Sequence, residues 1–185
     1  MIVIDAKEVE KARILFHESP NVVRAATVDA INRTSTAVKT FVSKTIRANY
    51  LVSAKDVKST LSIKRATKAN MVGTISSIGK PPLITAFRVK VYKKGPVKVQ
   101  VLKKGKPKEV RGLFMGTSLK GYVGAMQRKD LKMRYPLRIP HGPSIPQTFS
   151  AQRSMSSITP FAEKTLNQRF VHEIDYRFNK YGGKK

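Results

Sequence analysis

The 185-residue sequence contains no cysteine and no tryptophan. Without cysteine the chain cannot form a disulfide framework, a thiolate zinc site or a cysteine nucleophile, and it fits a reducing compartment. Histidine is scarce as well, since only His17, His141 and His172 occur. None of the three lies four positions from another or beside a pair of carboxylates, so we expect no metal site and no cofactor.

Motifs for nucleotide binding and for nucleophilic catalysis are also lacking. The sequence has no GxxxxGK[ST] and no GxGxxG, and its lysine–glycine stretches at 93–95 and 103–106 fit hairpin turns. His141 and Ser144 are close enough in sequence to suggest a base and a nucleophile, but the third group of a triad is missing. We therefore predict that the protein is not an enzyme.

Long apolar runs do not occur. No stretch of about 18 uncharged apolar residues is present, so we expect no membrane span. The N-terminus, MIVIDAKEVEKARILF, does not have the basic-then-apolar order of a secretory signal, and we expect no signal peptide.

Acidic residues are few, with 11 Asp and Glu against 37 Lys and Arg, a net charge of +26 and a pI near 10.6. Between Val57 and Lys108 there are fourteen Lys or Arg and no acidic residue. One lysine-rich turn would be an ordinary solvated surface. Repulsion over a whole sheet, however, favours a partner that supplies negative charge. The cations that we expect to contact an acidic partner or DNA are Arg33, Lys44, Arg47, Lys90, Lys93, Lys94, Lys98, Lys103, Lys104 and Lys106.

One long helix is predicted over residues 19–50. Ser19 is a suitable N-cap, Pro20 fits the first helical position, and no further Gly or Pro occurs before Gly73. Apolar residues recur at helical spacing on one face, with cations on the opposite face. The apolar positions are Ile31, Val38, Phe41, Val42, Thr45 and Ile46.

The remaining pattern predicts an α+β fold in a single domain over residues 1–185. Residues 5–61 are expected to be helical after a short strand at 2–4, and residues 61–128 to be rich in strands. Within the second region we expect a hairpin over 88–101 and strands near 113–115 and 122–126. A C-terminal helix is predicted over 159–181, with Thr159 as N-cap and Pro160 in its first position. We expect both long helices to pack on one antiparallel sheet of short strands.

A proline-rich segment over residues 134–150 separates the strands from the last helix. Four prolines and one glycine within 135–147 argue against a helix or a central strand there, so we expect an extended arm. A linker would be more polar than this segment, and we expect the arm to reach a neighbouring subunit. The predicted interface residues are Tyr135, Leu137, Ile139, Pro140, Pro143, Ile145 and Pro146.

Five short motifs follow one another along the chain. They are AINRT at 30–34, IRANY at 46–50, SAKDV at 53–57, PLITAF at 82–87 and RIPHGPSIPQ at 138–147. In this order the chain resembles the minor tail protein Z family of lambda-like phages and prophages, which are tail completion proteins of long-tailed virions. The dense lysines of residues 88–108 match no motif of that family.

The resemblance implies a structural virion subunit without catalytic residues. It implies copies arranged in a ring, expected to be a hexamer, at the head-proximal end of the tail. There the ring would complete the tail and join it to the head, in contact with other tail and neck proteins. From the charge pattern, and not from the resemblance, we expect the basic face to contact acidic tail proteins or the backbone of the phage DNA. It also implies assembly in the cytoplasm of the bacterial host.

An alternative is a helix-turn-helix DNA-binding protein, or a basic protein that binds nucleic acid without specificity. A tight turn separates the long helix from a short basic helix at 53–61, where Lys55 and Lys58 could contact DNA. Strand-like sequence follows this short helix directly, whereas a helix-turn-helix protein needs a core of three helices.

Overall fold

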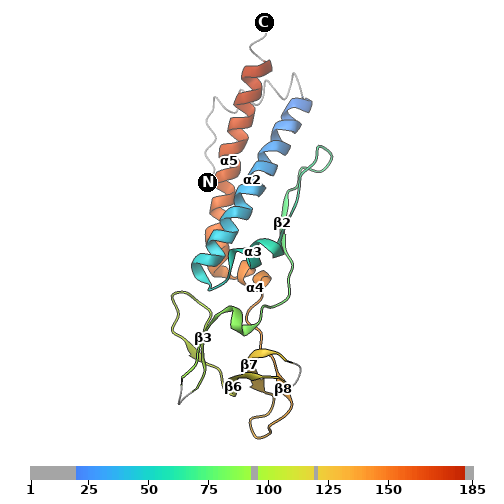
Figure 1. The fold of residues 1–185 in the computed structure, drawn as a ribbon. Coiled ribbons are helices and arrows are strands. Elements are labelled where there is room, and N and C mark those ends of the chain that lie inside the picture. Colours follow the sequence, from blue (N-terminus) through green and yellow to red (C-terminus); the bar gives the residue numbers. More distant parts are fainter. Residues whose placement is uncertain (1–19, 93–95, 119–120, 182–185) are drawn as a thin grey trace. The chain divides into compact units, whose positions relative to one another are not determined.

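The computed structural model describes residues 20–92, 96–118 and 121–181 (Figure 1). Its contacts form two compact units. Unit 1 contains Met1–Val42, Leu61–Ser76 and Met155–Lys185, and unit 2 contains Ser43–Thr60 and Ser77–Ser154. The predicted strand at 2–4, the helix at 5–17 and the Ser19 cap lie outside the described residues, and the single domain over 1–185 stays a prediction.

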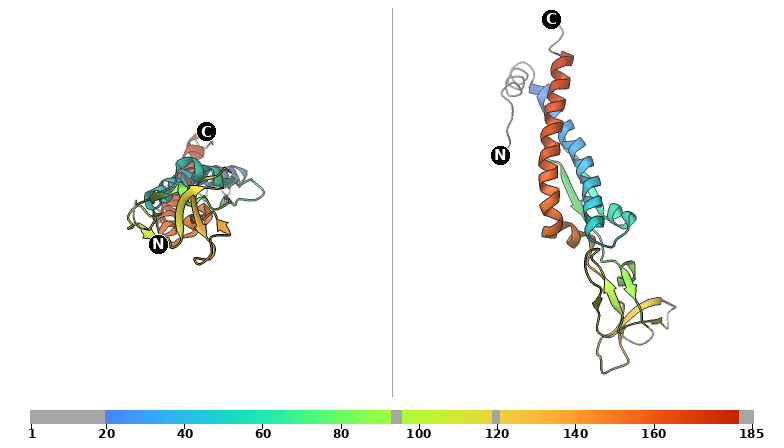
Figure 2. Two further views of the ribbon diagram at one scale, coloured as in Figure 1. Left: turned by 60° about the horizontal axis from the view of Figure 1, so that its bottom comes forward. Right: turned by 90° about the vertical axis from the view of Figure 1, so that its left-hand side faces the viewer.

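The predicted long helix is confirmed as α2, Pro20–Asn49. In unit 1 it lies beside α5, Gln152–Tyr181, as both views show (Figures 1 and 2). Val23 and Ala26 of α2 pack with Ile174 of α5. The rings of Phe41 and Phe161 stack with centroids 3.9 Å apart. None of the described helices is both long and apolar enough to cross a membrane.

The C-terminal helix begins earlier than the sequence predicts. It starts at Gln152, and Pro160 lies inside it. Proline in a helix interior removes one hydrogen bond, but burial of Ser154 and Ile158 fixes the first two turns and outweighs that loss. The prediction that Thr159 and Pro160 begin the helix is therefore wrong.

The short helix α3, Ala54–Thr60, forms where the sequence predicts it. Ser53 caps it, because its hydroxyl accepts from the Asp56 N–H at 3.1 Å. Strand β1, Leu61–Lys64, follows directly and pairs with β2, Thr74–Ser77. In unit 1 the side chain of Asn32 on α2 makes two hydrogen bonds with the backbone of Ala66, at 3.1 and 2.9 Å.

Unit 2 contains two three-stranded antiparallel sheets. The first comprises β3, Arg88–Lys90, β4, Lys98–Gln100, and β5, Lys108–Glu109. The second comprises β6, Leu113–Thr117, β7, Val123–Arg128, and β8, Leu137–Arg138. A short 3₁₀ helix, η1, spans Ile84–Ala86. The core residues are Ile84, Phe87, Val97, Val99, Leu113 and Ala125.

The α+β class, the predicted hairpin and the two later strands are confirmed. The strands form three small sheets, however, where the sequence predicts one. Gly112 has φ +73 in the turn between β5 and β6, where the first sheet of unit 2 ends and the second begins.

Part of the proline-rich segment is helical. Helix α4 spans Ile145–Ser150, with Ser144 as its N-cap. The Ser144 hydroxyl accepts from the Gln147 N–H at 3.3 Å, and the Gln147 side chain accepts from the Ser144 N–H at 2.9 Å. Pro146 lies in the first turn, where a helix needs no N–H donor. The prediction of an extended arm through residue 150 is therefore wrong.

Candidate interaction surfaces

Positive charge is concentrated in unit 2. Its residues include 22 Lys and Arg but only three Asp and Glu, so the unit carries +19 of the net +26. Unit 1 has 15 Lys and Arg against eight Asp and Glu. Charge that is this unequal sets up a positive potential around one unit, which attracts anionic partners.

The sheet β3–β4–β5 presents part of this charge on one face. Val89 pairs with Val99 in register, and Val99 is buried in the core of unit 2. Because side chains alternate between the two faces of a strand, Arg88, Lys90 and Lys98 belong to the opposite face. That face is the basic sheet face.

Two lysines on the basic sheet face lie directly opposite each other. Lys90 of β3 pairs with Lys98 of β4 in an antiparallel register. Side chains at such positions have Cβ atoms about 5 Å apart, so like charges there destabilise the sheet. Glu109 of β5 pairs with Lys98 from the other side and offsets only part of the charge. An anion held between Lys90 and Lys98 would relieve their repulsion.

Further groups extend the basic sheet face. The Nζ atom of Lys98 lies 5.6 Å from the centroid of the exposed Tyr92 ring, within cation–π range. The side-chain amide of Gln100 donates to the carbonyls of Leu102 at 3.1 Å and Gly105 at 2.8 Å, which fixes the turn after β4. That turn carries Lys103 and Lys104, and Lys106 follows it; all three are exposed.

The other predicted cations have different positions. Lys44 and Arg47 are exposed near the end of α2, within unit 2. Arg33 belongs to unit 1, where its Nη1 lies 2.5 Å from Glu173 Oε1, so its charge is balanced inside the chain. Lys93 and Lys94 lie outside the described residues.

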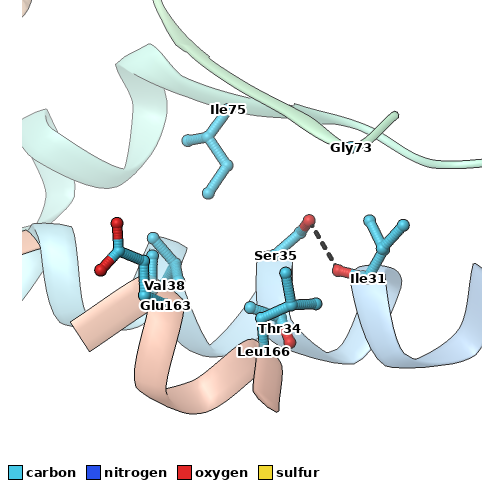
Figure 3. Close-up of a pocket in the computed structure, with 9 residues that line it drawn as sticks. Ile31, Thr34, Ser35, Val38, Gly73, Ile75, Glu163 and Leu166 are labelled. Atoms are coloured by element: carbon cyan, nitrogen blue, oxygen red, sulfur yellow. Dashed lines mark hydrogen bonds between the residues drawn. The ribbon is translucent and has the colours of Figure 1, made fainter. Parts of the chain in front are cut away.

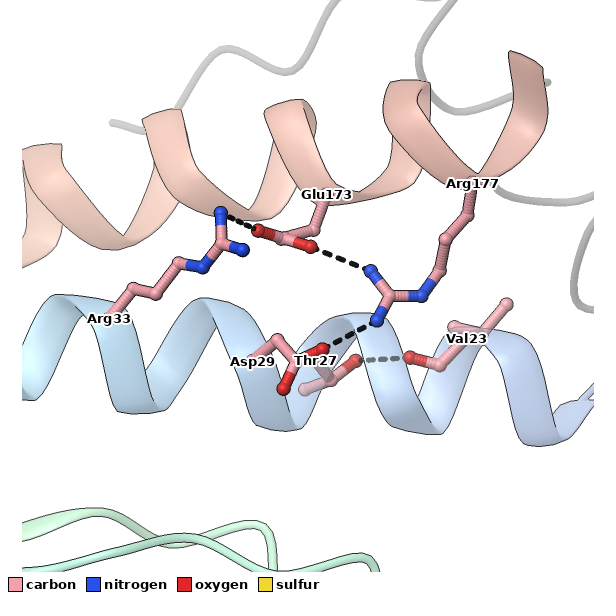
Figure 4. Close-up of polar contacts among 6 residues, drawn as sticks. All are labelled: Val23, Thr27, Asp29, Arg33, Glu173 and Arg177. Atoms are coloured by element: carbon pink, nitrogen blue, oxygen red, sulfur yellow. Dashed lines mark hydrogen bonds and ion pairs between the residues drawn. The ribbon is translucent and has the colours of Figure 1, made fainter. Parts of the chain in front are cut away.

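Arg33 is part of a four-residue ion network between α2 and α5 (Figure 4). Arg177 contacts Glu173 at 2.6 Å and Asp29 at 2.5 Å. Burial lowers the pKa of Arg177, but its hydrogen bonds to Glu173 and Asp29 outweigh this and leave the pKa raised. Arg177 is therefore fully charged at any physiological pH. Sequence reasoning missed this network, although Asp29–Arg33 and Glu173–Arg177 both have i,i+4 spacing.

The predicted interface residues divide by exposure. Tyr135 and Ile139 are 54% and 39% exposed. Leu137, Pro140, Pro143 and Pro146 are half-buried. Ile145 is 2% exposed in α4, so its side chain packs within its own subunit and does not belong to the exposed surface. Sequence reasoning missed the exposed apolar side chains of Leu131 and Met133 just before this segment.

The positions of Ser144 and His141 provide no catalytic pair. The Ser144 hydroxyl is buried and caps α4, while His141 is exposed and forms a β-bridge with Leu83. In the part of the chain that the structure describes, no hydrogen bond joins the two. Nor does any group of three or more His, Asp or Glu side chains among the described residues have the arrangement of a metal site.

The helix-turn-helix alternative finds little support in the fold. Helix α3 has seven residues; Lys55 and Lys58 are exposed and Val57 is buried. It contacts α4 and leads directly into β1. A recognition helix is instead supported by a compact bundle of helices.

Comparison with known proteins gives one family. The family model described as prophage minor tail protein Z (GPZ) matches residues 13–181, which includes both units and nearly the whole chain. No curated protein and no solved structure matches the chain.

Proposed function

The chain belongs to the prophage minor tail protein Z family, and from this structural role in phage tails we propose that it acts as a ring subunit which completes the tail and joins it to the head. The observation that carries this proposal is the family match over residues 13–181. The ring, expected to be a hexamer, would lie at the head-proximal end of the tail, next to other tail and neck proteins. It would work by binding neighbours and not by catalysis.

The apolar residues around β8 support contact with a neighbour. Met133, Tyr135 and Ile139 are exposed within a short stretch of unit 2. Buried apolar anchors surrounded by a polar rim are typical of protein interfaces. Arg134 and Arg138 alternate with these residues in the sequence and are exposed, so they can supply the polar part of such an interface.

Changing Ile139→Asp tests the role in assembly. The variant should fold but fail to form rings, because a charge would be placed among the exposed apolar side chains around β8. Size-exclusion chromatography with light scattering measures the oligomer, and complementation of a phage that lacks the gene measures tail function. Val123→Asp is the matched control, since Val123 is 74% exposed in the same unit. Ring formation and tail function unchanged in Ile139→Asp would overturn the proposal.

A second function, contact with the DNA backbone, is favoured by the opposed Lys90 and Lys98. Such contact depends on charge and not on base sequence, so the affinity for unrelated DNA duplexes should be the same. The affinity should also fall steeply as the salt concentration rises, because added salt reduces the free energy gained when binding releases counterions from the DNA. A gel-shift series at several salt concentrations measures both properties. A defined site bound ~10³-fold tighter than bulk DNA would favour a regulator instead.

A further inference from the structure

Unit 1 contains an apolar groove of about 310 Å³ between α2, β2 and α5 (Figure 3). Ile31 and Val38 line it from α2, and Leu166 from α5. Ile75 of β2 points toward α2 across the groove (Figure 3). Its size is at the lower end of cavities that bind ligands or side chains.

The accessible polar lining defines what the groove can accept. Thr34 is only 7% exposed, and its Oγ1 has no hydrogen-bond partner among the described residues. That oxygen has almost no accessible surface, so an occupant of the groove does not reach it. Glu163 also lines the groove and is exposed. The matching occupant has apolar side chains and a positive charge.

Unit 2 carries a loop with this chemistry. Residues 129–136 connect β7 to β8, and the loop is closed by the Lys129 N–H, which donates to the Pro136 carbonyl at 3.1 Å. The Lys132 N–H donates to Asp130 Oδ1 at 2.9 Å inside it. Because these bonds already fix the loop, little entropy is lost when it binds.

The side chains of the loop alternate between apolar and basic. Leu131, Met133 and Tyr135 are 47%, 59% and 54% exposed. Lys132 and Arg134 lie between them in the sequence and are exposed as well.

We propose that the 129–136 loop of one copy occupies the α2–β2–α5 groove of the next copy. The apolar side chains fill the groove, and the Lys132 and Arg134 cations face Glu163. Two different surfaces meet in this contact, so it is head-to-tail and generates a ring when the rotation closes. The inference rests on the proposed function and names the two surfaces that join its subunits.

Charge is what selects a second copy as the occupant. A loop with two cations needs a site that contains a carboxylate, and Glu163 belongs to unit 1, the unit with less positive charge. The same contact also covers the exposed apolar side chains of the loop, which would otherwise remain in water.

Because the chain has no cysteine, a disulfide cross-link tests the contact directly. Met133→Cys and Leu166→Cys are made in separate chains, and the two are mixed under mild oxidation. Docking raises the effective thiol concentration to about the millimolar range. We therefore expect the disulfide-linked mixed dimer to form at least about tenfold faster than the corresponding dimer of the control pair. The control pairs Leu166→Cys with Val123→Cys, whose parent side chain is also exposed in unit 2. Equal rates would overturn the inference.

A charge exchange provides an independent test. Glu163→Lys and the double variant Lys132→Glu/Arg134→Glu should each weaken self-association about tenfold, and their combination should restore it. Lys164→Glu is the control on the same helix and should have little effect. Combined variants that associate no better than the single ones would overturn the inference.

Two further outcomes are decisive. A chain with both Met133→Cys and Leu166→Cys that forms only an intrachain disulfide would overturn the inference, because the loop would then fill its own groove. Rings seen by electron microscopy without the cross-link would overturn it too, while the proposed function would stand. Absence of the chain from purified tails would instead contradict the proposed function.

Discussion

The guanidinium of Arg177 on α5 donates to Asp29 Oδ2 on α2 at 2.5 Å, although 148 positions separate the two residues. The same guanidinium contacts Glu173, whose side chain is 3% exposed. Arg33 approaches Glu173 from α2. The network therefore ties together the two long helices within unit 1, and its two carboxylates balance the charge of its two guanidinium groups.

Removal of the central carboxylate should destabilise unit 1. Glu173→Gln keeps the shape but leaves Arg177 half-paired and Arg33 unpaired, and loss of one partner of a buried pair costs about 3 kcal/mol. Urea unfolding followed by circular dichroism measures the free energy of unfolding. Glu163→Gln is the control on an exposed position of the same helix. A loss no larger than the control's would contradict the role of the network.

The raised pKa of Arg177 gives a prediction for alkaline pH. A folded-state pKa above the unfolded value adds stability that is lost only as pH rises through the folded pKa, and for arginine that lies beyond the usable range. Lysine has an ordinary pKa of about 10.4 and lacks the planar fork. Arg177→Lys should thus be less stable at pH 7 and lose more stability near pH 10.5. A pH series of unfolding midpoints checks this, and parallel curves for parent and variant would contradict it.

Gly142 should not tolerate a side chain. A Cβ atom there would lie 2.0 Å from Cε2 of Phe87, which is buried in the core of unit 2. Forcing the ring to move costs about 1–3 kcal/mol, so Gly142→Ala should lower the unfolding midpoint. In a chain that also carries Phe87→Leu, Gly142→Ala should lower the unfolding midpoint by less than it does in the parent chain. Additive losses in the double variant would argue against the contact.

Lys90→Thr should have opposite effects on the stability of the fold and on the affinity for DNA. Removing one of two opposed lysines should stabilise the sheet by about 0.2–1 kcal/mol. It should also lower the affinity for duplex DNA and make the affinity less sensitive to salt. Thermal unfolding and salt-dependent fluorescence anisotropy measure the two effects. Loss of stability would contradict the repulsion between Lys90 and Lys98, and an unchanged salt dependence would show that Lys90 does not contact the DNA backbone.

Local patterns were enough to predict much of this fold. The helix from Pro20, the hairpin around Lys90 and the cap at Ser53 follow from spacing, turn residues and capping, all of which act over a few positions. The start of α5 before Pro160 could not be predicted, because it depends on burial of Ser154 and Ile158 by the folded chain.

The candidate sites were predictable only in part. A high density of lysine indicates a basic surface, but only the register shows that Lys90 and Lys98 are opposite. The pairing of Arg33 with Glu173 depends on contact between two distant helices, so the sequence predicted Arg33 as a free cation. Helix α4 could have been found, since Ser144-x-x-Gln147 has the spacing of a capping box.

The most direct test of the account is electron cryomicroscopy of purified tails, made with the parent chain and with a chain that carries a small C-terminal tag. We predict a closed ring of this protein at the head-proximal end of the tail, with the tag density repeated once per copy. Tails that lack the protein, or a monomer attached at a single position elsewhere on the particle, would contradict the account.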